Sequence, residues 1–149
     1  MHIVLVEPEI PQNTGNIARL CALTETSLHL VGKLGFSISD YYLRRAGLDY
    51  WDSLSVDRHD TLSVLMQLTH GRFFFVCTKA QRLYTEIRYL FDDYLVFGNE
   101  SQGLPKKLIE ENYDASIRIP MWGAKPRSLN LSNAAAIVLY EALRQIRGF

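Results

Sequence analysis

Continuous runs of apolar residues recur along the chain, separated by polar segments. Such runs are typical of parallel strands that are buried on both faces of a sheet. They occupy residues 3–6 (IVLV), 72–77 (RFFFVC) and 94–97 (YLVF), and residues 27–31 and 115–119 add two more. We also expect a short strand at residues 54–56 and assign the ambiguous residues 84–90 to another short strand.

Capping residues and glycine or proline signals predict helices between these runs. The first helix begins with a cap at Asn13 or Thr14 and ends near residue 25. Its inner side carries Ile17, Leu20, Cys21 and Thr24. Further helices are expected from Ser39 or Asp40 to Gly47, after a cap at Asp60, and from Pro105 to about residue 111.

Residues 117–147 combine a strand end, a polar loop and a long helix. The strand stops at Pro120, which lacks the N–H that a sheet requires. Ser128, Asn130 and Ser132 provide capping side chains where the helix begins. Between residues 134 and 139 the helix is apolar on every side (AAAIVL). Such a helix has to be covered twice, so we expect the sheet on one side and a second copy of the chain, over the alanines, on the other.

Strands that alternate with helices predict an α/β fold, with an open, mainly parallel sheet and helices on both faces. The 149 residues are long enough for a single domain. Ligands of such sheets bind beyond the carboxyl ends of the strands. The loops after Cys77, Phe97 and Ile119 should lie at that edge.

The composition narrows the functional classes. The chain is 48% hydrophobic and 21% charged, with a formal net charge of zero, which argues against a general high-affinity coat for nucleic acids. No apolar run is long enough to span a membrane. Cys21 and Cys77 are expected to be buried, reduced thiols of a cytoplasmic protein. The four histidines show no metal-ligand spacing, and no pattern for covalent catalysis is present.

The loop from Gly98 to Gly103 follows an apolar strand. It is not a phosphate-binding loop, because Leu104 stands where a lysine is required, and it lacks the glycine pattern of dinucleotide sites. Two interpretations remain. The loop brings its backbone and Glu100 close to a flat ligand, or it is a plain turn between a strand and a helix.

Other polar residues also have two interpretations. Ser128 and Asn130 are helix caps or members of a site, and Ser132 alone is the more typical cap. Arg19 has no acidic residue three or four positions away on its helix, so it is either functional or a solvated surface residue. Basic pairs, each a possible solvated surface, occur at residues 44–45, 79 and 82, and 125 and 127.

Three motifs together resemble the SPOUT class (SpoU/TrmH-like) of RNA 2′-O-methyltransferases. They are NTGNIAR at residues 13–19, FGNESQGLP at 97–105, and IPM at 119–121 with SLNLSNA at 128–134. The similarity is closest to single-domain TrmL-type members, which methylate the ribose of the wobble nucleotide 34, a cytidine or 5-carboxymethylaminomethyluridine, of leucine tRNAs. EPEIPQNTGNIARL at residues 7–20 and RRAGLDYW at 44–51 extend the resemblance over nearly the whole chain.

The resemblance implies a C-terminal trefoil knot that holds S-adenosylmethionine. It also implies a cytoplasmic, metal-free homodimer that pairs through the first and last helices, with the partner's first-motif arginine completing each site. The implied catalytic residues are Asn13, Arg19, Glu100, Ser128 and Asn130. The implied cofactor contacts are Val76, Cys77, Thr78, Gly98, Asn99, Glu100, Gly103, Ile119, Met121, Ser128 and Leu129. The expected RNA contacts are Arg19, Arg44, Arg45, Lys125 and Arg127; the loop 122–126 is slightly longer than is usual in the family.

The chemistry fits these residues. A sulfonium donor leaves as a neutral thioether, so no metal is needed for a departing anion, and the remaining tasks are alignment and removal of a hydroxyl proton. A guanidinium stays protonated, so our hypothesis is that Arg19 orients the hydroxyl and stabilises the developing alkoxide, while a phosphate of the RNA helps carry the proton. Glu100 should position its loop or the partner's arginine.

Two alternative functions remain open. They are methylation of another tRNA or rRNA site, and a non-catalytic flavodoxin-like module that binds nucleotides.

Overall fold

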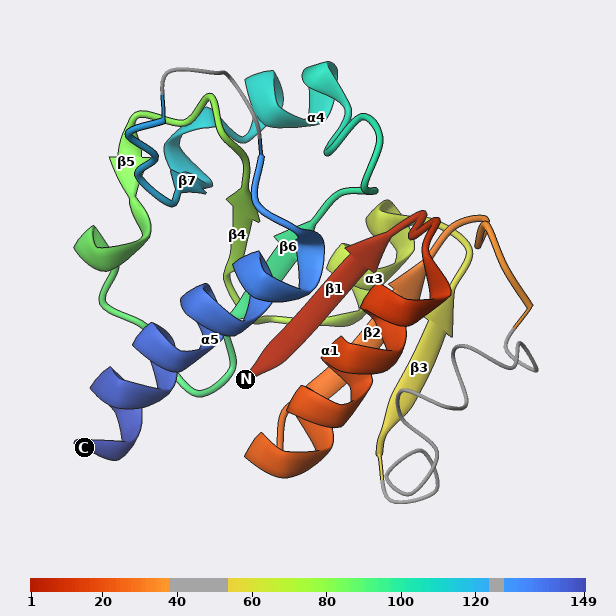
Figure 1. Ribbon diagram of the computed structural model, residues 1–149, viewed down its shortest axis with the longest axis horizontal. Helices are drawn as coiled ribbons and strands as arrows, with labels where there is room; N and C mark the ends of the chain where they lie inside the picture. The colour runs from red at the N-terminus through yellow and green to blue at the C-terminus, as the bar shows by residue number, and fades with distance from the viewer. Residues whose placement is uncertain (38–53, 124–127) are drawn as a thin grey trace.

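The computed structural model describes residues 1–37, 54–123 and 128–149 (Figure 1). Its described strands form one sheet, in which each strand is parallel to its neighbours and the order is β3-β2-β1-β6-β4-β7-β5. The strands are β1 (His2–Val6), β2 (Ser27–Val31), β3 (Val56–His59), β4 (Phe73–Val76), β5 (Arg82–Leu83), β6 (Tyr94–Phe97) and β7 (Ser116–Arg118). The expected parallel α/β sheet is confirmed.

Helices cover both faces of this sheet, as predicted. The helices α1 (Pro11–Thr24) and α5 (Leu131–Arg147) lie side by side on one face (Figure 1). The helices α3 (Leu62–Leu68) and α4 (Lys106–Glu111) lie on the other face. Alternate residues of the central strands face opposite layers. In β1, Ile3 and Leu5 pack with α1 and α5, whereas Val4 packs with the cluster that includes Leu62 of α3.

The order of the strands brings three loops together. The strands β6, β4 and β7 are neighbours, so the loops that follow Phe97, Val76 and Arg118 leave the same carboxyl edge. A backbone bond between the Cys77 N–H and the Ile117 carbonyl, with an N–O distance of 2.9 Å, extends the β4–β7 pairing one residue beyond the end of β4. Ligands of open parallel sheets bind at this edge.

Several element boundaries differ from the predictions. Helix α1 begins at Pro11, without a side-chain cap. Proline suits a first helical position, because the N–H it lacks would have no partner there. Thr61 rather than Asp60 caps α3, accepting a hydrogen bond from the Val64 N–H. The strand expected at residues 54–56 lies further on, at Val56–His59, and its pairing with β2 fixes that position.

The strand expected at residues 84–90 was wrong. A two-residue strand at Arg82–Leu83 leads into a short 3-10 helix at Tyr84–Glu86, where the Glu86 carboxylate accepts a hydrogen bond from the Leu83 N–H at 2.6 Å. Ile87 and Tyr89 are both buried, and this alternation resembles that of a strand. The Tyr89 N–H, however, donates to the Gln145 side chain of α5 and not to a neighbouring strand.

The last helix is only partly enclosed by the chain itself. Its residues Ala135, Val138 and Leu139 are fully buried on the sheet, but Ile137 is 37% exposed and Tyr140 is 49% exposed. The outward side of α5 is therefore open in the single chain.

Among the described residues no helix combines the length and apolar character needed to cross a membrane. The helix predicted for residues 39–47 lies outside the described residues. The trefoil knot stays a prediction, since the segment that leads into α5 includes residues 124–127, which also lie outside them.

Candidate active site

Glu100 lies at the centre of a group of hydrogen bonds beside the first helix. Its carboxylate accepts from the backbone N–H groups of Glu9 at 2.8 Å and Ile10 at 3.1 Å, and from the Asn13 side-chain amide at 3.0 Å. The N–H groups at and just before the start of a helix have no partners within the helix, and a carboxylate there is favoured by the helix dipole. Glu100 therefore fixes the start of α1 against the loop after β6.

Asn13 connects this carboxylate to the last helix. Its amide nitrogen donates to Glu100, and its oxygen accepts from the Asn130 side-chain amide at 2.9 Å. The Asn130 oxygen accepts from the Ser132 hydroxyl and from the N–H groups of Ser132 and Asn133, so Asn130 is the N-cap of α5. The structure thus joins the first, second and third sequence motifs in one hydrogen-bonded row, Glu100–Asn13–Asn130. Ser132, expected to be the cap, instead donates to it.

The loop from Gly98 to Gly103 closes on itself. The Gly103 N–H donates to the Asn99 carbonyl at 3.0 Å, and the Gln102 N–H donates to the Asn99 side chain at 2.8 Å. A Cβ atom on Gly98 would lie 2.0 Å from the Gly103 carbonyl carbon, and Gly103 has a φ of +71°. Both glycines are therefore required by the turn itself. The turn between a strand and a helix is therefore confirmed, and it carries Glu100 to α1; the contact with a flat ligand stays a prediction.

The residues expected to contact a cofactor lie along the carboxyl edge. Val76 ends β4 and is followed by half-buried Cys77 and exposed Thr78, while Gly98 directly follows β6 and is buried. Beyond β7, Met121 is 39% exposed and Trp122 is 90% exposed, and Leu129, just before the cap of α5, is 39% exposed. The exposed side chains of Met121, Trp122 and Leu129 offer the apolar surface that a purine nucleoside requires, so the residues present fit S-adenosylmethionine.

Other predicted site residues lie outside the hydrogen-bonded row. Arg19 is exposed on α1, six residues beyond buried Asn13, which is about 9 Å along the axis and on a different side of the helix. Ser128 is exposed at the entrance to α5. Arg44, Arg45, Lys125 and Arg127 lie outside the described residues. Burial raises the pKa of the Cys21 thiol to about 12, which agrees with a structural thiol.

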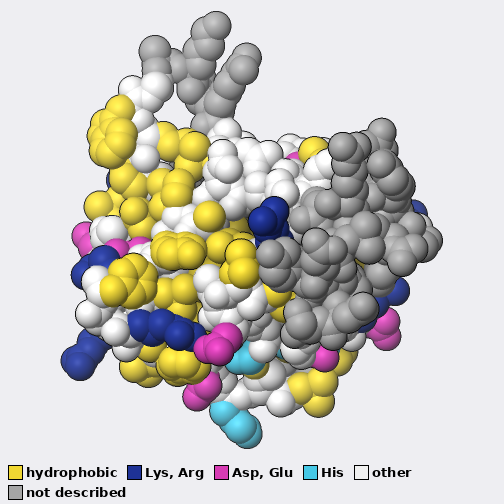
Figure 2. Space-filling model, turned by 60° about the horizontal axis from the view of Figure 1, so that its bottom comes forward, with side chains coloured by type: hydrophobic (Ala, Val, Ile, Leu, Met, Phe, Trp, Pro, Cys, Tyr) yellow, Lys and Arg dark blue, Asp and Glu magenta, His cyan; other side chains and the backbone are white. Residues whose placement is uncertain are grey.

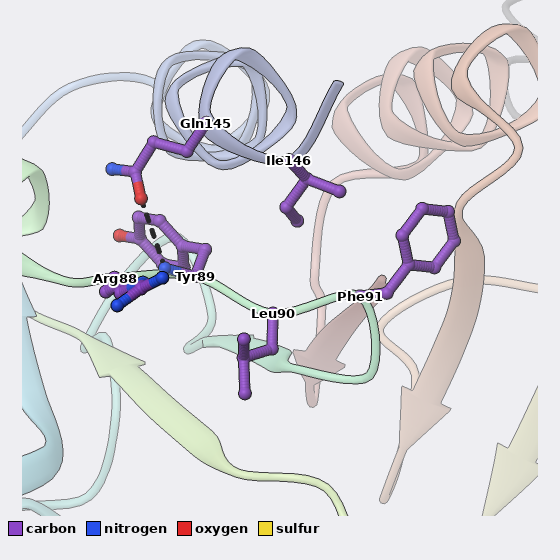
Figure 3. A pocket seen from close by; sticks show the side chains of 6 residues that line it. All are labelled: Arg88, Tyr89, Leu90, Phe91, Gln145 and Ile146. Atoms are coloured by element: carbon purple, nitrogen blue, oxygen red, sulfur yellow. Dashed lines mark hydrogen bonds between the residues drawn. The ribbon is translucent and has the colours of Figure 1, made fainter. Parts of the chain in front are cut away.

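A shallow pocket is found elsewhere in the described chain. It is lined by Arg88, Tyr89, Leu90, Phe91, Gln145 and Ile146 (Figure 3). Gln145 and Ile146 are at the carboxyl end of α5, about 22 Å along the helix from Asn130. The dashed bond in Figure 3 joins the Gln145 side chain to the Tyr89 N–H and holds the loop against the helix. This pocket is therefore separate from the candidate active site.

Sequence reasoning missed two residues at the site. The Glu9 carboxylate accepts hydrogen bonds from the Ser101 N–H at 3.2 Å and from the Ser101 hydroxyl. Glu9 precedes α1 and Ser101 follows Glu100, so they join the same two segments a second time. A glutamate between two prolines and a serine in a turn are ordinary loop residues. Only their position inside the matching segments 7–20 and 97–105 could have indicated a role at the site.

Comparisons with known proteins agree with this geometry. The family model of the SpoU rRNA Methylase family matches residues 1–140. The Escherichia coli (strain K12) tRNA (cytidine(34)-2′-O)-methyltransferase is 45% identical and covers 98% of this chain and 94% of its own. A Bacillus subtilis (strain 168) protein given the same activity provisionally is 54% identical and covers 97% and 92%.

Solved structures show the same architecture. A structure described as giving insights into the 2-OH methylation of C/U34 on tRNA has a TM-score of 0.93, is 41% identical, and covers 99% of this chain and 97% of its own. The SpoU methyltransferase AviRb from Streptomyces viridochromogenes, in complex with AdoMet, has a TM-score of 0.86, is 25% identical, and covers 97% and 60%. The parallel sheet, the joined motifs and these similarities agree: the chain belongs to the SpoU methylase family.

Proposed function

We propose that this chain methylates the ribose 2′-hydroxyl of nucleotide 34 of a tRNA, with S-adenosylmethionine as the methyl donor. The single observation that carries the proposal is the Glu100–Asn13–Asn130 row, which brings all three family motifs to the carboxyl edge of the sheet. Relatives that are similar over nearly their whole length are named for this reaction. Structural relatives bind AdoMet on the same fold.

The described residues have distinct tasks in this reaction. The cofactor supplies an activated methyl group, so the protein has to align it with the ribose hydroxyl and exclude water. Asn130 fixes the entrance of α5 next to the loop after β7, and Glu100 fixes the loop after β6. Because the Glu100 carboxylate is occupied by three donors, it positions the site and is not the base that removes the hydroxyl proton.

We infer that the active unit is a homodimer formed through α1 and α5. Exposed apolar side chains on these helices and at the C-terminus support this: Leu23 is 62% exposed, Tyr140 is 49% exposed and Phe149 is 69% exposed. Figure 2 shows one surface of the molecule, on which hydrophobic side chains gather over the half where α5 lies. Asn13 points into its own chain while Arg19 lies exposed on another side of the same helix, which favours a role for Arg19 at the surface between the protomers.

We further propose that the substrates are leucine tRNAs and that the reaction takes place in the cytoplasm, where tRNA is used. Nucleoside mass spectrometry of tRNA from cells with and without the gene tests this proposal. Loss of one ribose methyl group at nucleotide 34 of leucine tRNAs is expected. A missing methyl group in ribosomal RNA, with tRNA unchanged, would contradict the substrate. A purified protein that does not bind S-adenosylmethionine would contradict the reaction.

A further inference from the structure

Two acidic residues of neighbouring segments exchange hydrogen bonds. The Glu100 carboxylate accepts from the Glu9 N–H at 2.8 Å, and the Glu9 carboxylate accepts from the N–H of the next residue, Ser101, at 3.2 Å and from its hydroxyl. We call Glu9, Glu100 and Ser101 the loop clasp. Each of the two segments accepts hydrogen bonds through a carboxylate and donates one through a backbone N–H. Neither segment can therefore shift along the other without breaking bonds to a charged group.

The Glu9 side of the clasp is also held from behind. The Gly35 N–H donates to the Pro8 carbonyl at 2.9 Å. A Cβ atom on Gly35 would lie 2.8 Å from the Glu9 Cα and 3.0 Å from the Glu9 carbonyl oxygen, so only glycine allows this close approach. The Glu9 backbone is thus packed between residue 35 and Glu100. Glu9 is therefore a fixed support, and its side chain reaches out to the more exposed Ser101.

Ser101 belongs to the turn that carries Glu100. The turn begins at Gly98, directly after β6, and its internal bonds link Asn99 to Gln102 and Gly103. Ser101 is the tip of this turn, and its two bonds to Glu9 connect the tip to a support outside the turn. The orientation of the backbone from Gly98 to Gly103 therefore depends on Glu9 as well as on the glycines.

We propose that Glu9 and Ser101 are positioning residues that fix the loop from Gly98 to Gly103 for cofactor binding, with the Ser101 hydroxyl acting through the Glu9 carboxylate. The inference rests on the proposed function, in which this loop contacts S-adenosylmethionine. Loss of the clasp lowers the affinity for the cofactor and leaves the maximal rate at saturating cofactor nearly unchanged, because the clasp does not touch the reacting atoms.

The test compares Ser101→Ala, Ser101→Thr and Glu9→Met in the full chain; methionine has nearly the length of glutamate but no oxygen to accept the bonds from Ser101. Ser101→Ala should raise the KM for S-adenosylmethionine and its calorimetric Kd about tenfold, roughly the effect of losing one hydrogen bond to a charged group, and Glu9→Met at least as much. Neither kcat nor the KM for tRNA should change by more than about twofold. Ser101→Thr keeps the hydroxyl and should retain the affinity of the natural protein.

The double variant Glu9→Met with Ser101→Ala decides whether the hydroxyl acts through Glu9. If it does, Ser101→Ala should have little further effect once Glu9 has been replaced, so the two changes are not additive. Matched controls are Ser63→Ala and Glu110→Met, which change exposed residues of α3 and α4 and should leave the Kd unaltered.

The outcomes separate this inference from the proposed function. A natural protein that binds S-adenosylmethionine, with single variants that bind equally well, overturns the role of the clasp and leaves the function standing. Additive effects in the double variant also overturn it, because Ser101 would then act independently of Glu9. Lower melting temperatures with an unchanged KM would show a merely structural role and overturn it as well. Failure of the natural protein to bind the cofactor rejects the proposed function itself.

Discussion

Asn130 performs two tasks with the two ends of one amide. Its oxygen caps α5, and its nitrogen donates to Asn13 at 2.9 Å. The substitution Asn130→Asp separates these tasks, because aspartate is an equally good N-cap but has no N–H to donate. We expect the melting temperature to remain close to that of the natural protein, while methyl transfer to tRNA falls by about a hundredfold, since an active site misaligned by about 1 Å loses that factor.

Asn130→Ala provides the comparison. It removes both the cap and the link to Asn13, so it should lose activity and also about 1 kcal/mol of stability. Measured kcat/KM and thermal unfolding of the three proteins check the prediction. An active Asn130→Asp protein would show that capping is the only task of this residue.

Some site residues could be predicted from the sequence and others could not. Asn13, Glu100 and Asn130 stood out because they lie in three motifs of one family, but their hydrogen bonds join residues 87 and 117 positions apart. Local patterns carry no information on such pairings. Ser101 lies in the second motif and Glu9 in the segment that extends the first, yet nothing in their residue types distinguishes a clasp from solvated loop residues.

At the scale of elements, buried strands were the most predictable part of the fold. Each apolar run became a strand because a parallel sheet covered on both faces requires apolar residues at successive positions. Residues 84–90 were wrong because buried Ile87 and Tyr89 alternate as in a strand while the Tyr89 N–H is bound by α5. Helix starts were shifted where Pro11 took the first helical position of α1 and where Thr61 took the capping position of α3.

A row of three histidines crosses strands β1, β2 and β3. His29 is buried between His2, with a nitrogen-to-nitrogen distance of 3.0 Å, and His59, at 3.1 Å, and it also faces the Tyr94 ring and, at 3.8 Å, the Asp57 carboxylate. Burial, followed by the neighbouring His2, lowers the pKa of His29 to about 4 from 6.5. The sequence showed the four histidines only as isolated residues, since the pairing of the strands creates the row.

This lowered pKa makes stability depend on pH. Between pH 6.5 and 4 the unfolded chain binds a proton at this histidine and the folded chain does not, so the free energy of unfolding should fall as the pH falls. The contribution of His29 is limited to about 3 kcal/mol. Urea unfolding at several pH values should show a weaker decline for His29→Gln than for the natural protein. His70→Gln, a change of an exposed histidine outside the row, should keep the original decline.

At the scale of the whole molecule, α1 and α5 each have apolar residues on two sides. Their inner sides cover the sheet, and their outer sides expose Leu23, Ile137 and Tyr140. Replacing Tyr140 by glutamate should therefore turn the proposed dimer into a monomer, because a charge on an apolar interface is costly to bury. Light scattering after gel filtration checks the mass. Leu68→Glu, a change of a residue 70% exposed on α3, should leave the dimer intact.

A dimer of this kind predicts that two inactive variants restore each other. If each site combines Asn130 of one protomer with Arg19 of its partner, Arg19→Ala and Asn130→Asp should both be inactive alone. In a mixed dimer, one site has the intact Asn130 of the first variant and the intact Arg19 of the second, and the other site has both defects. Unfolding and refolding an equal mixture should restore about a quarter of the natural activity, since half of the symmetric dimers are mixed and each has one working site.

The same mixture distinguishes the location of Arg19. If Arg19 serves the site of its own chain, every site in every dimer carries one of the two defects and no activity returns. Refolding each variant separately controls for gain of activity by the procedure itself. The result depends on which protomer supplies Arg19 and not on how strongly either variant is impaired. It therefore tests directly the arrangement that buried Asn13 and exposed Arg19, on one helix, favour.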